Sequence, residues 1–308
     1  MVACKLPKLD ARVRFPLPAP ANLFRRRPHR PLAAMLAVLL LAISMVMSPP
    51  AQADGWPNYW DPRERAVLPD LTGRDRIRFL TTADFPPFNF VDQRNRIAGF
   101  HIDLARAVCA ELNMTARCQL QVLPWDELAA AMDSRQGEAI IAGLALDSDR
   151  RRDYLFTRPF IKLPARFAVR TAAPPAGESA VVLAGRPVGV LRGTAHEALL
   201  RAYFPDIRPV AHEDGDALFD GLRNGAVEAV FGDGVQLSFW LGSNEAAGCC
   251  GFFDGPYFAP AFLGEGLSIA VRRDSPDLVL AFDHALQALS GNGTMRELYL
   301  RYFPNGLY

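Results

Sequence analysis

The sequence is short of the residues that build metal and redox sites. Its five histidines are scattered, and its five cysteines include no pair spaced as Cys-x-x-Cys. Structural zinc sites gather such residues at short, regular spacing, so we expect neither a metal site nor a cofactor. The chain also lacks a large excess of Lys and Arg over Asp and Glu, since its formal net charge is only +1. Binding to nucleic acid would need a basic face, so we expect no nucleic-acid partner.

An apolar run near the N-terminus is too short to cross a membrane comfortably. The run LAAMLAVLLLAISMVM at 32–47 has 16 residues, whereas a spanning helix needs about 20. A membrane anchor is the alternative, but basic residues precede the run and Ala51-Gln52-Ala53 follows it, as in a secretory cleavage site. No Cys stands at that point, so we expect no lipid anchor. We expect residues 1–53 to be a signal peptide, cleaved near Ala53, that directs the protein to the periplasm.

Basic residues are concentrated in this N-terminal segment. Residues 1–53 hold eight of the 34 Lys and Arg but one of the 33 Asp and Glu, so 54–308 carry 26 basic and 32 acidic residues, a net charge near −6. Half of the whole chain is hydrophobic and 22% is charged, which is typical of a folded protein. The length suffices for two ordinary domains. We expect a soluble monomer.

Four cysteines remain beyond the expected signal peptide, and they allow three pairings. Cys109 and Cys118 lie nine residues apart across a predicted helix-to-strand turn, so we expect them to form a disulfide in an oxidising compartment. A bond between Cys249 and Cys250 would be vicinal, which is strained and uncommon.

Strands and helices alternate twice along the chain, after an irregular extension at 54–75. The first series has expected strands at 76–82, 116–123 and 138–144, with helices at 99–113 and 124–137. Such a βαβαβ unit forms a parallel sheet. The second series has strands at 186–193, 207–212 and 226–233, with helices at 194–204 and 216–225. A loop at 242–265, two C-terminal helices at about 277–290 and 293–303, and strands at 166–170 and 266–273 complete the prediction.

This pattern predicts an α/β protein with two lobes. We expect one lobe from 76–168 plus 268–308 and a second from 169–267. The strands at 166–170 and 266–273 are the candidates for the crossings between them. In open α/β sheets, ligands bind beyond the carboxyl ends of strands, where helix N-termini present free N–H groups.

Four segments fall at such strand ends, namely TTADFPPF, AGLALDSDR, LRGTAHE and FGDGVQ. Arg150 in the second would face an anion there, and Asp233 in the fourth would be half-buried without a cation. Each also has an ordinary interpretation. Arg150 would then be part of a solvated turn, Asp233 would cap a helix, and the aromatic residues Phe85 and Trp125 would belong to the core.

The same segments resemble a known family. TTADFPPFNFVDQRNRIAGFHIDLARAVCAEL, PWDELAAAM, AIIAGLALDSDRRRDYLFTRPF and VEAVFGD look like the periplasmic amino-acid-binding proteins of ABC uptake systems (bacterial extracellular solute-binding proteins, family 3). The resemblance runs in unbroken order from about 76 to 304. It implies a type II periplasmic-binding-protein fold, in which two α/β lobes joined by two hinge strands enclose a ligand cleft. It also implies a receptor, not an enzyme, that captures an amino acid or similar polar solute for a membrane ABC permease.

The resemblance further assigns roles to single residues. Arg150 would pair with the ligand α-carboxylate, which a planar guanidinium grips with two parallel hydrogen bonds. Asp233 would receive the α-ammonium, and the ligand side chain would lie between Phe85 and Trp125. Further contacts would come from Ala142, Gly143 and Thr194, while Ala145 and Ala195 stand where the family has hydroxyl groups, each worth about 1 kcal/mol.

Two other functions are compatible with the scaffold. An enzyme resembling the exported cyclohexadienyl dehydratases of the family would need an acid or base at the ligand side chain. The candidates are Asp84, His196 and Glu265, and no two of them have convincing spacing. An accessory protein of a periplasmic oxidation system would act through its surface with an empty cleft. The presence of both Arg150 and Asp233 favours the receptor over that accessory role.

Overall fold

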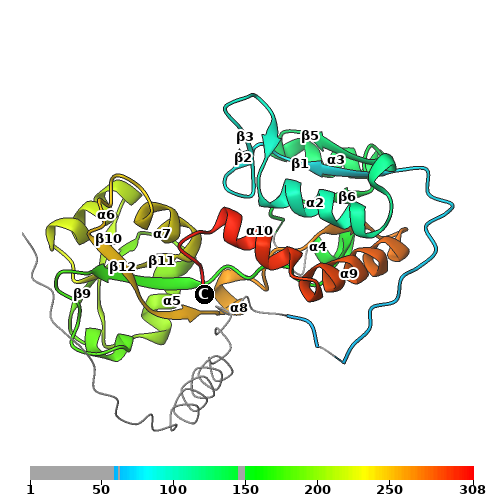
Figure 1. Cartoon of the computed structure of the whole chain (residues 1–308). Coiled ribbons are helices and arrows are strands. Elements are labelled where there is room, and N and C mark those ends of the chain that lie inside the picture. The colour runs from blue at the N-terminus through cyan, green and yellow to red at the C-terminus, as the bar shows by residue number, and fades with distance from the viewer. Residues whose placement is uncertain (1–58, 62, 145–149) are drawn as a thin grey trace, which may run out of the picture. The chain divides into compact units, whose positions relative to one another are not determined.

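The structure is a computed structural model, and it describes residues 59–61, 63–144 and 150–308. The expected signal peptide and the expected site residue Ala145 lie outside these residues. No helix in the described part of the chain is long and apolar enough to span a bilayer. Internal contacts group Asp54–Tyr308 into one unit, which contains two large β-sheets and a small one (Figure 1).

The first sheet has the strand order β5-β1-β6-β13-β7. Strand β1 pairs in parallel with both β5 and β6, whereas β13 runs antiparallel to β6 and β7. The parallel core agrees with the predicted βαβαβ unit. The strands are β1 (Ile77–Thr81), β5 (Cys118–Val122), β6 (Ala139–Ile140), β7 (Tyr154–Phe156) and β13 (Ala270–Arg272), and the associated helices are α2 (Phe100–Glu111), α3 (Leu128–Asp133), α9 (Pro276–Gly291) and α10 (Thr294–Tyr302).

Hydrophobic spacing explains how α2 packs against this sheet. The positions expected on its apolar face are all buried, and all of them but Ile102 join one core cluster with β1 and α9. Phe79 of β1 and Phe282 of α9 meet in that cluster with ring centroids 5.2 Å apart. The residues that confirm the predicted helical spacing are Ile102, Ala105, Val108, Cys109 and Leu112.

The second sheet has the order β10-β9-β11-β8-β12, in which β9 pairs in parallel with β10 and β11. Strand β8 runs antiparallel to β11 and β12. The strands are β8 (Ala165–Arg170), β9 (Pro187–Leu191), β10 (Arg208–His212), β11 (Ala229–Asp233) and β12 (Cys250–Tyr257), and the helices are α5 (Ala195–Tyr203), α6 (Gly215–Asn224) and α7 (Gly234–Leu241). Gly225, which was expected to end α6, does so at φ 82°, a left-handed conformation that suits glycine.

Two elements of the second sheet differ from the prediction. Helix α7 has no counterpart among the predicted element bounds, although a helix capped by Asp233 was one interpretation of that residue. Its sequence GVQLSFWL is apolar on nearly every face and shows no amphipathic period. Strand β12 was expected to be loop, since CGFFDGPY contains residues typical of turns. The strand accommodates them through a register shift between Phe253 and Tyr257.

The connections between the two sheets also lie elsewhere than expected. All of β8 belongs to the second sheet, so the chain passes between the sheets before Ala165 and not within 166–170. The return connection follows β12. Ile161 and Leu267 form an antiparallel bridge where these two connections run side by side. The expected strand 266–273 is therefore reduced to this bridge and the short β13.

Residues of the extension and of the C-terminal segment contact the first connection and the start of β8. The extension has no helix or strand in its described residues, but Trp60 and Leu71 are buried in the core of the first sheet. Contacts recur at every fourth residue from Arg158 in the connection to Arg166 in β8. Arg158 pairs with Glu64, the Lys162 ammonium lies 5.0 Å from the centre of the Tyr59 ring, and Arg166 Nη1 donates to the Leu307 carbonyl at 3.0 Å.

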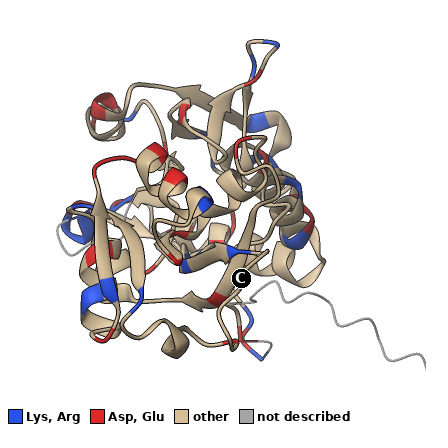
Figure 2. Ribbon diagram, turned by 90° about the vertical axis from the view of Figure 1, so that its left-hand side faces the viewer, with Lys and Arg blue, Asp and Glu red and all other residues tan. Residues whose placement is uncertain are grey.

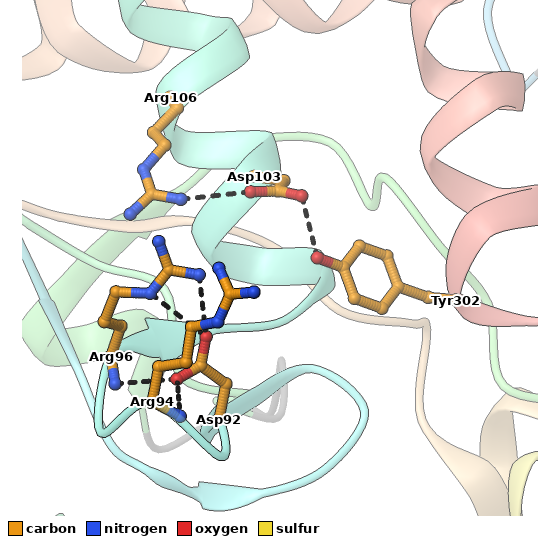
Figure 3. A network of polar contacts seen from close by, with 6 residues as sticks. All are labelled: Asp92, Arg94, Arg96, Asp103, Arg106 and Tyr302. Atoms are coloured by element: carbon orange, nitrogen blue, oxygen red, sulfur yellow. Dashed lines mark hydrogen bonds and ion pairs between the residues drawn. The ribbon is translucent and has the colours of Figure 1, made fainter.

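Charged side chains of both signs are interspersed over the helices and strands (Figure 2). Figure 3 shows two local clusters near the third sheet, which comprises β2 (Asp84–Phe85), β3 (Asn89–Val91) and β4 (Ile97–Ala98). Asp92 Oδ1 accepts from the backbone N–H groups of Arg94 and Arg96 at 2.8 and 2.9 Å, which closes the β3–β4 turn. Asp103 of α2 accepts from Tyr302 Oη of α10 at 2.7 Å. These hydrogen bonds fix the local geometry. The exposed ion pairs in the two clusters contribute about 0–1 kcal/mol each to stability.

Both cysteine pairs are at bonding distance in the structure. The sulfur atoms of Cys109 and Cys118 are 1.96 Å apart, and the bond ties the C-terminal part of α2 to the start of β5. Those of Cys249 and Cys250 are 2.12 Å apart, so the structure contains the vicinal pairing that we regarded as uncommon.

We predict that Cys109 and Cys118 are oxidised in the exported protein. The closed loop is short, so the bond should stabilise the fold by about 2–3 kcal/mol. Thiol labelling of the denatured, unreduced protein should modify neither residue, with the reduced protein as the positive control. Labelling of both positions without reductant would contradict the prediction.

Candidate functional site

Asp233 stands at the carboxyl end of β11, where the chain turns into α7. Its Oδ1 atom accepts from the backbone N–H groups of Val235 and Gln236 at 2.8 and 2.9 Å. The carboxylate therefore caps the helix, which was its ordinary interpretation. Of its two oxygens, only Oδ1 makes hydrogen bonds with described residues.

Thr194 caps the neighbouring helix α5. Its hydroxyl accepts from Glu197 N at 3.2 Å and donates to the Leu191 carbonyl at 2.8 Å. The Glu197 carboxylate in turn accepts from the backbone N–H of Gly193, the residue before the cap, at 2.7 Å. Ala195 follows as the first helical residue and is exposed.

His196 adds a titratable group next to Asp233. Strands β9 and β11 are parallel neighbours, so α5 and α7 begin at the same edge of the sheet. Burial lowers the pKa of the His196 imidazole, and the nearby Asp233 carboxylate acts in the opposite direction. The neutral imidazole is therefore the main form at pH 7, beside a carboxylate at the end of a parallel strand.

On the first sheet, Phe85 packs against Gly143. A Cβ atom at position 143 would lie only 2.6 Å from Phe85 Cε1, and Gly143 has φ +81°. Both facts require glycine here. The Phe85 ring also stacks on Phe88, with centroids 4.8 Å apart, so its position is fixed from two sides.

The other expected site residues near the first sheet differ in how far they are buried. Ala142 is buried in the cluster between the sheet and α3. Trp125 starts a 3₁₀ turn (Trp125–Glu127) and has 46% of its surface exposed. Arg150 is the first residue of the short helix α4 (Arg150–Asp153), where its charge acts on the Tyr154 hydroxyl.

A cavity of about 540 Å³ contains one expected residue from each half of the site. These residues are Phe85 and Asp233. Trp125, Arg150 and Thr194 are not among the described residues that line it. The lining residues are Phe85, Pro86, Phe88, Leu163, Asp233, Val235, Gln236 and Phe239. Sequence reasoning missed Val235, Gln236 and Phe239 because it did not recognise α7.

The candidates for acid or base catalysis are not assembled into a pair. Glu265 Oε2 accepts from Arg151 Nη2 at 2.9 Å, and both side chains are about half exposed. Asp84 is exposed on β2, and His196 has Asp233 as its charged neighbour. Among the described residues, no group of His, Cys, Asp or Glu could hold a metal ion.

Two α/β sheets and an aromatic cavity with one carboxylate define a protein that binds a small solute. The chain belongs to the bacterial extracellular solute-binding proteins, family 3, whose model matches residues 77–305. It is a solute receptor of this family and not an enzyme.

Several curated proteins are similar over most of their length. The chain is 32% identical to "Putative ABC transporter arginine-binding protein 2" of Escherichia coli (strain K12), covering 75% of this chain and 92% of that protein. It is 30% identical to "ABC transporter arginine-binding protein 1" of the same organism, covering 75% and 91%. These relatives support the family assignment.

Solved structures confirm the expected fold, two α/β lobes of the type II periplasmic-binding-protein kind. The L-cystine solute receptor of Neisseria gonorrhoeae superposes with a TM-score of 0.65 at 15% identity, covering 75% of this chain and 94% of that one. The second substrate-binding domain of a putative amino acid ABC transporter from Streptococcus pneumoniae gives a TM-score of 0.64 at 21% identity, covering 74% and 100%.

Proposed function

We propose that the protein is a periplasmic receptor that captures a free amino acid and delivers it to a membrane ABC permease. The observation that carries the proposal is the cavity shared by Phe85 and Asp233. A cavity lined by phenylalanines and a single carboxylate suits a ligand with an ammonium group and a side chain. The relatives are named as amino-acid-binding proteins of ABC transporters, which supports the same ligand class.

In this proposal the α-ammonium binds the carboxylate of Asp233, and the α-carboxylate binds Arg150. Closure of the two lobes brings Arg150 and Trp125 to the ligand, with Trp125 on the side of the side chain opposite Phe85. The exposure of Trp125 fits a residue that becomes covered only when ligand is present. Backbone groups at Ala142, Gly143 and the α5 N-terminus complete the polar contacts. The missing hydroxyl groups at Ala145 and Ala195 would weaken them.

A thermal-shift screen of residues 54–308 against the common L-amino acids tests this function. At least one free amino acid should raise the midpoint of unfolding, because a ligand that binds only the folded state stabilises it. The N-acetylated and amidated forms of that amino acid should have little effect, since each lacks one charged group. A screen without any responding amino acid would refute the proposal.

The proposed location has its own test. We propose that cleavage near Ala53 releases a soluble periplasmic protein that begins near Asp54. The intact mass of the exported protein decides this, and a species that retains residues 32–47 would contradict it.

We predict that ligand binding weakens as the pH falls, because of His196. Burial lowers the pKa of this imidazole, so it is neutral at pH 7.5 and becomes charged on acidification. The imidazolium would then compete with the ligand ammonium for Asp233. Because this pKa lies below the ordinary value of 6.5, affinity should be constant near pH 7.5 and should fall on the way to pH 5. Calorimetry at both values should show a much smaller change in His196→Gln, and an equal change in both proteins would assign the effect elsewhere.

A further inference from the structure

The cavity walls indicate what kind of ligand side chain they would accept. Six of the eight lining residues are apolar, and three of these are phenylalanines. The two polar residues, Asp233 and Gln236, belong to the N-terminal cap and first turn of α7. Of the described lining residues, only Asp233 carries a charge, and the proposed function already assigns it to the α-ammonium.

Phe85 and Phe88 form an aromatic wall of the cavity, and the polar groups behind it are neutral. His101 lies 4.9 Å from Phe88 between ring centroids and is completely buried. Its Nδ1 atom is 2.8 Å from Asn89 Oδ1, and Asn89 Nδ2 donates to Thr82 Oγ1 at 2.6 Å. Burial lowers the pKa of His101 to about 3, so the imidazole is uncharged at physiological pH. The other nitrogen, Nε2, is buried without a hydrogen-bond partner among the described residues.

Two carboxylates that were candidates for the site are engaged or exposed. Asp84 adjoins Phe85 but is exposed on β2, and Glu265 is paired with Arg151. Of the described residues that line the cavity, none besides Asp233 offers a carboxylate to a cationic side chain enclosed against the phenylalanines. An unpaired buried charge is strongly unfavourable, whereas an apolar side chain gains free energy from the same burial.

We infer that the ligand is an amino acid with an uncharged, apolar side chain, because the cavity joins an aromatic wall backed by neutral groups to a single carboxylate. This inference rests on the proposed function and makes it more specific. It separates the protein from relatives that are named for arginine.

Calorimetry on residues 54–308 at pH 7.5 with L-leucine, L-phenylalanine, L-glutamine and L-arginine tests the inference. L-leucine or L-phenylalanine should bind at least tenfold more tightly than L-arginine and more tightly than L-glutamine. Tighter or equal binding of L-arginine or L-glutamine would overturn the inference but leave the proposed function standing. If none of the common amino acids binds, the proposed function fails and the inference fails with it.

A second carboxylate in the cavity should shift this preference. Gln236→Glu changes an amide to a carboxylate of the same shape, next to the aromatic wall. The ratio of L-arginine affinity to L-leucine affinity should rise at least fivefold. Gln136→Glu is exposed and does not line the cavity, so it controls for net charge and should leave the ratio unchanged. Equal ratios in the two variants would contradict the placement of the ligand side chain against α7.

Discussion

Arg150→Ala should weaken binding of the amino acid by about 2–5 kcal/mol, because the variant leaves the ligand carboxylate unpaired in a closed cleft. This corresponds to a loss of roughly 30-fold to several thousandfold in affinity. Arg150 begins α4, the helix that follows β6 of the first sheet in chain order, whereas Asp233 ends a strand of the second. In our proposal neither residue makes a complete site, and the zwitterionic ligand joins them.

Arg151→Ala is the matched control, since it removes the same side chain one residue later. Arg151 Nη2 lies 2.9 Å from Glu265 Oε2. Both partners are about half exposed, so their interaction contributes about 0–1 kcal/mol to stability. Calorimetry should show wild-type affinity for Arg151→Ala. Equal losses of affinity in Arg150→Ala and Arg151→Ala would show that these arginines belong to a solvated turn and do not bind the ligand.

The predicted fold succeeds where local pattern and burial agree. Helices α2 and α6 have a regular apolar face and clear end signals, and they form within a few residues of the predicted bounds. Prediction from the hydrophobic pattern fails where a helix is apolar on all sides or where residues typical of turns occur inside a strand. Helix α7 and strand β12 are those cases, and the loss of α7 removed three lining residues from the predicted site.

The sequence predicted single residues of the candidate site at separate strand ends, but not which of them would lie together. Motifs placed Phe85, Thr194 and Asp233 next to the ends of separate strands. The proximity of His196 to Asp233 depends on the pairing of β9 with β11, which no local pattern encodes. The contact of Arg151 with Glu265 joins residues 114 positions apart, and such pairing follows from tertiary packing alone.

Asp233→Asn should separate the two roles of this residue, helix cap and ammonium receptor. Asparagine caps helices as well as aspartate does, so the N–H groups of Val235 and Gln236 keep an acceptor and α7 keeps its stability. The amide carries no charge, so the ligand ammonium loses its partner in the cleft. Affinity should fall by about 2–5 kcal/mol with an unchanged midpoint of thermal unfolding.

Asp233→Ala completes the comparison, because it removes the charge and the cap together. This variant should lose affinity to the same extent as Asp233→Asn and should also lose about 1 kcal/mol of folding stability. Calorimetry and thermal unfolding of the three proteins give both quantities. Wild-type affinity in Asp233→Asn, combined with destabilised Asp233→Ala, would show that the carboxylate only caps α7, and the ammonium would then need another partner.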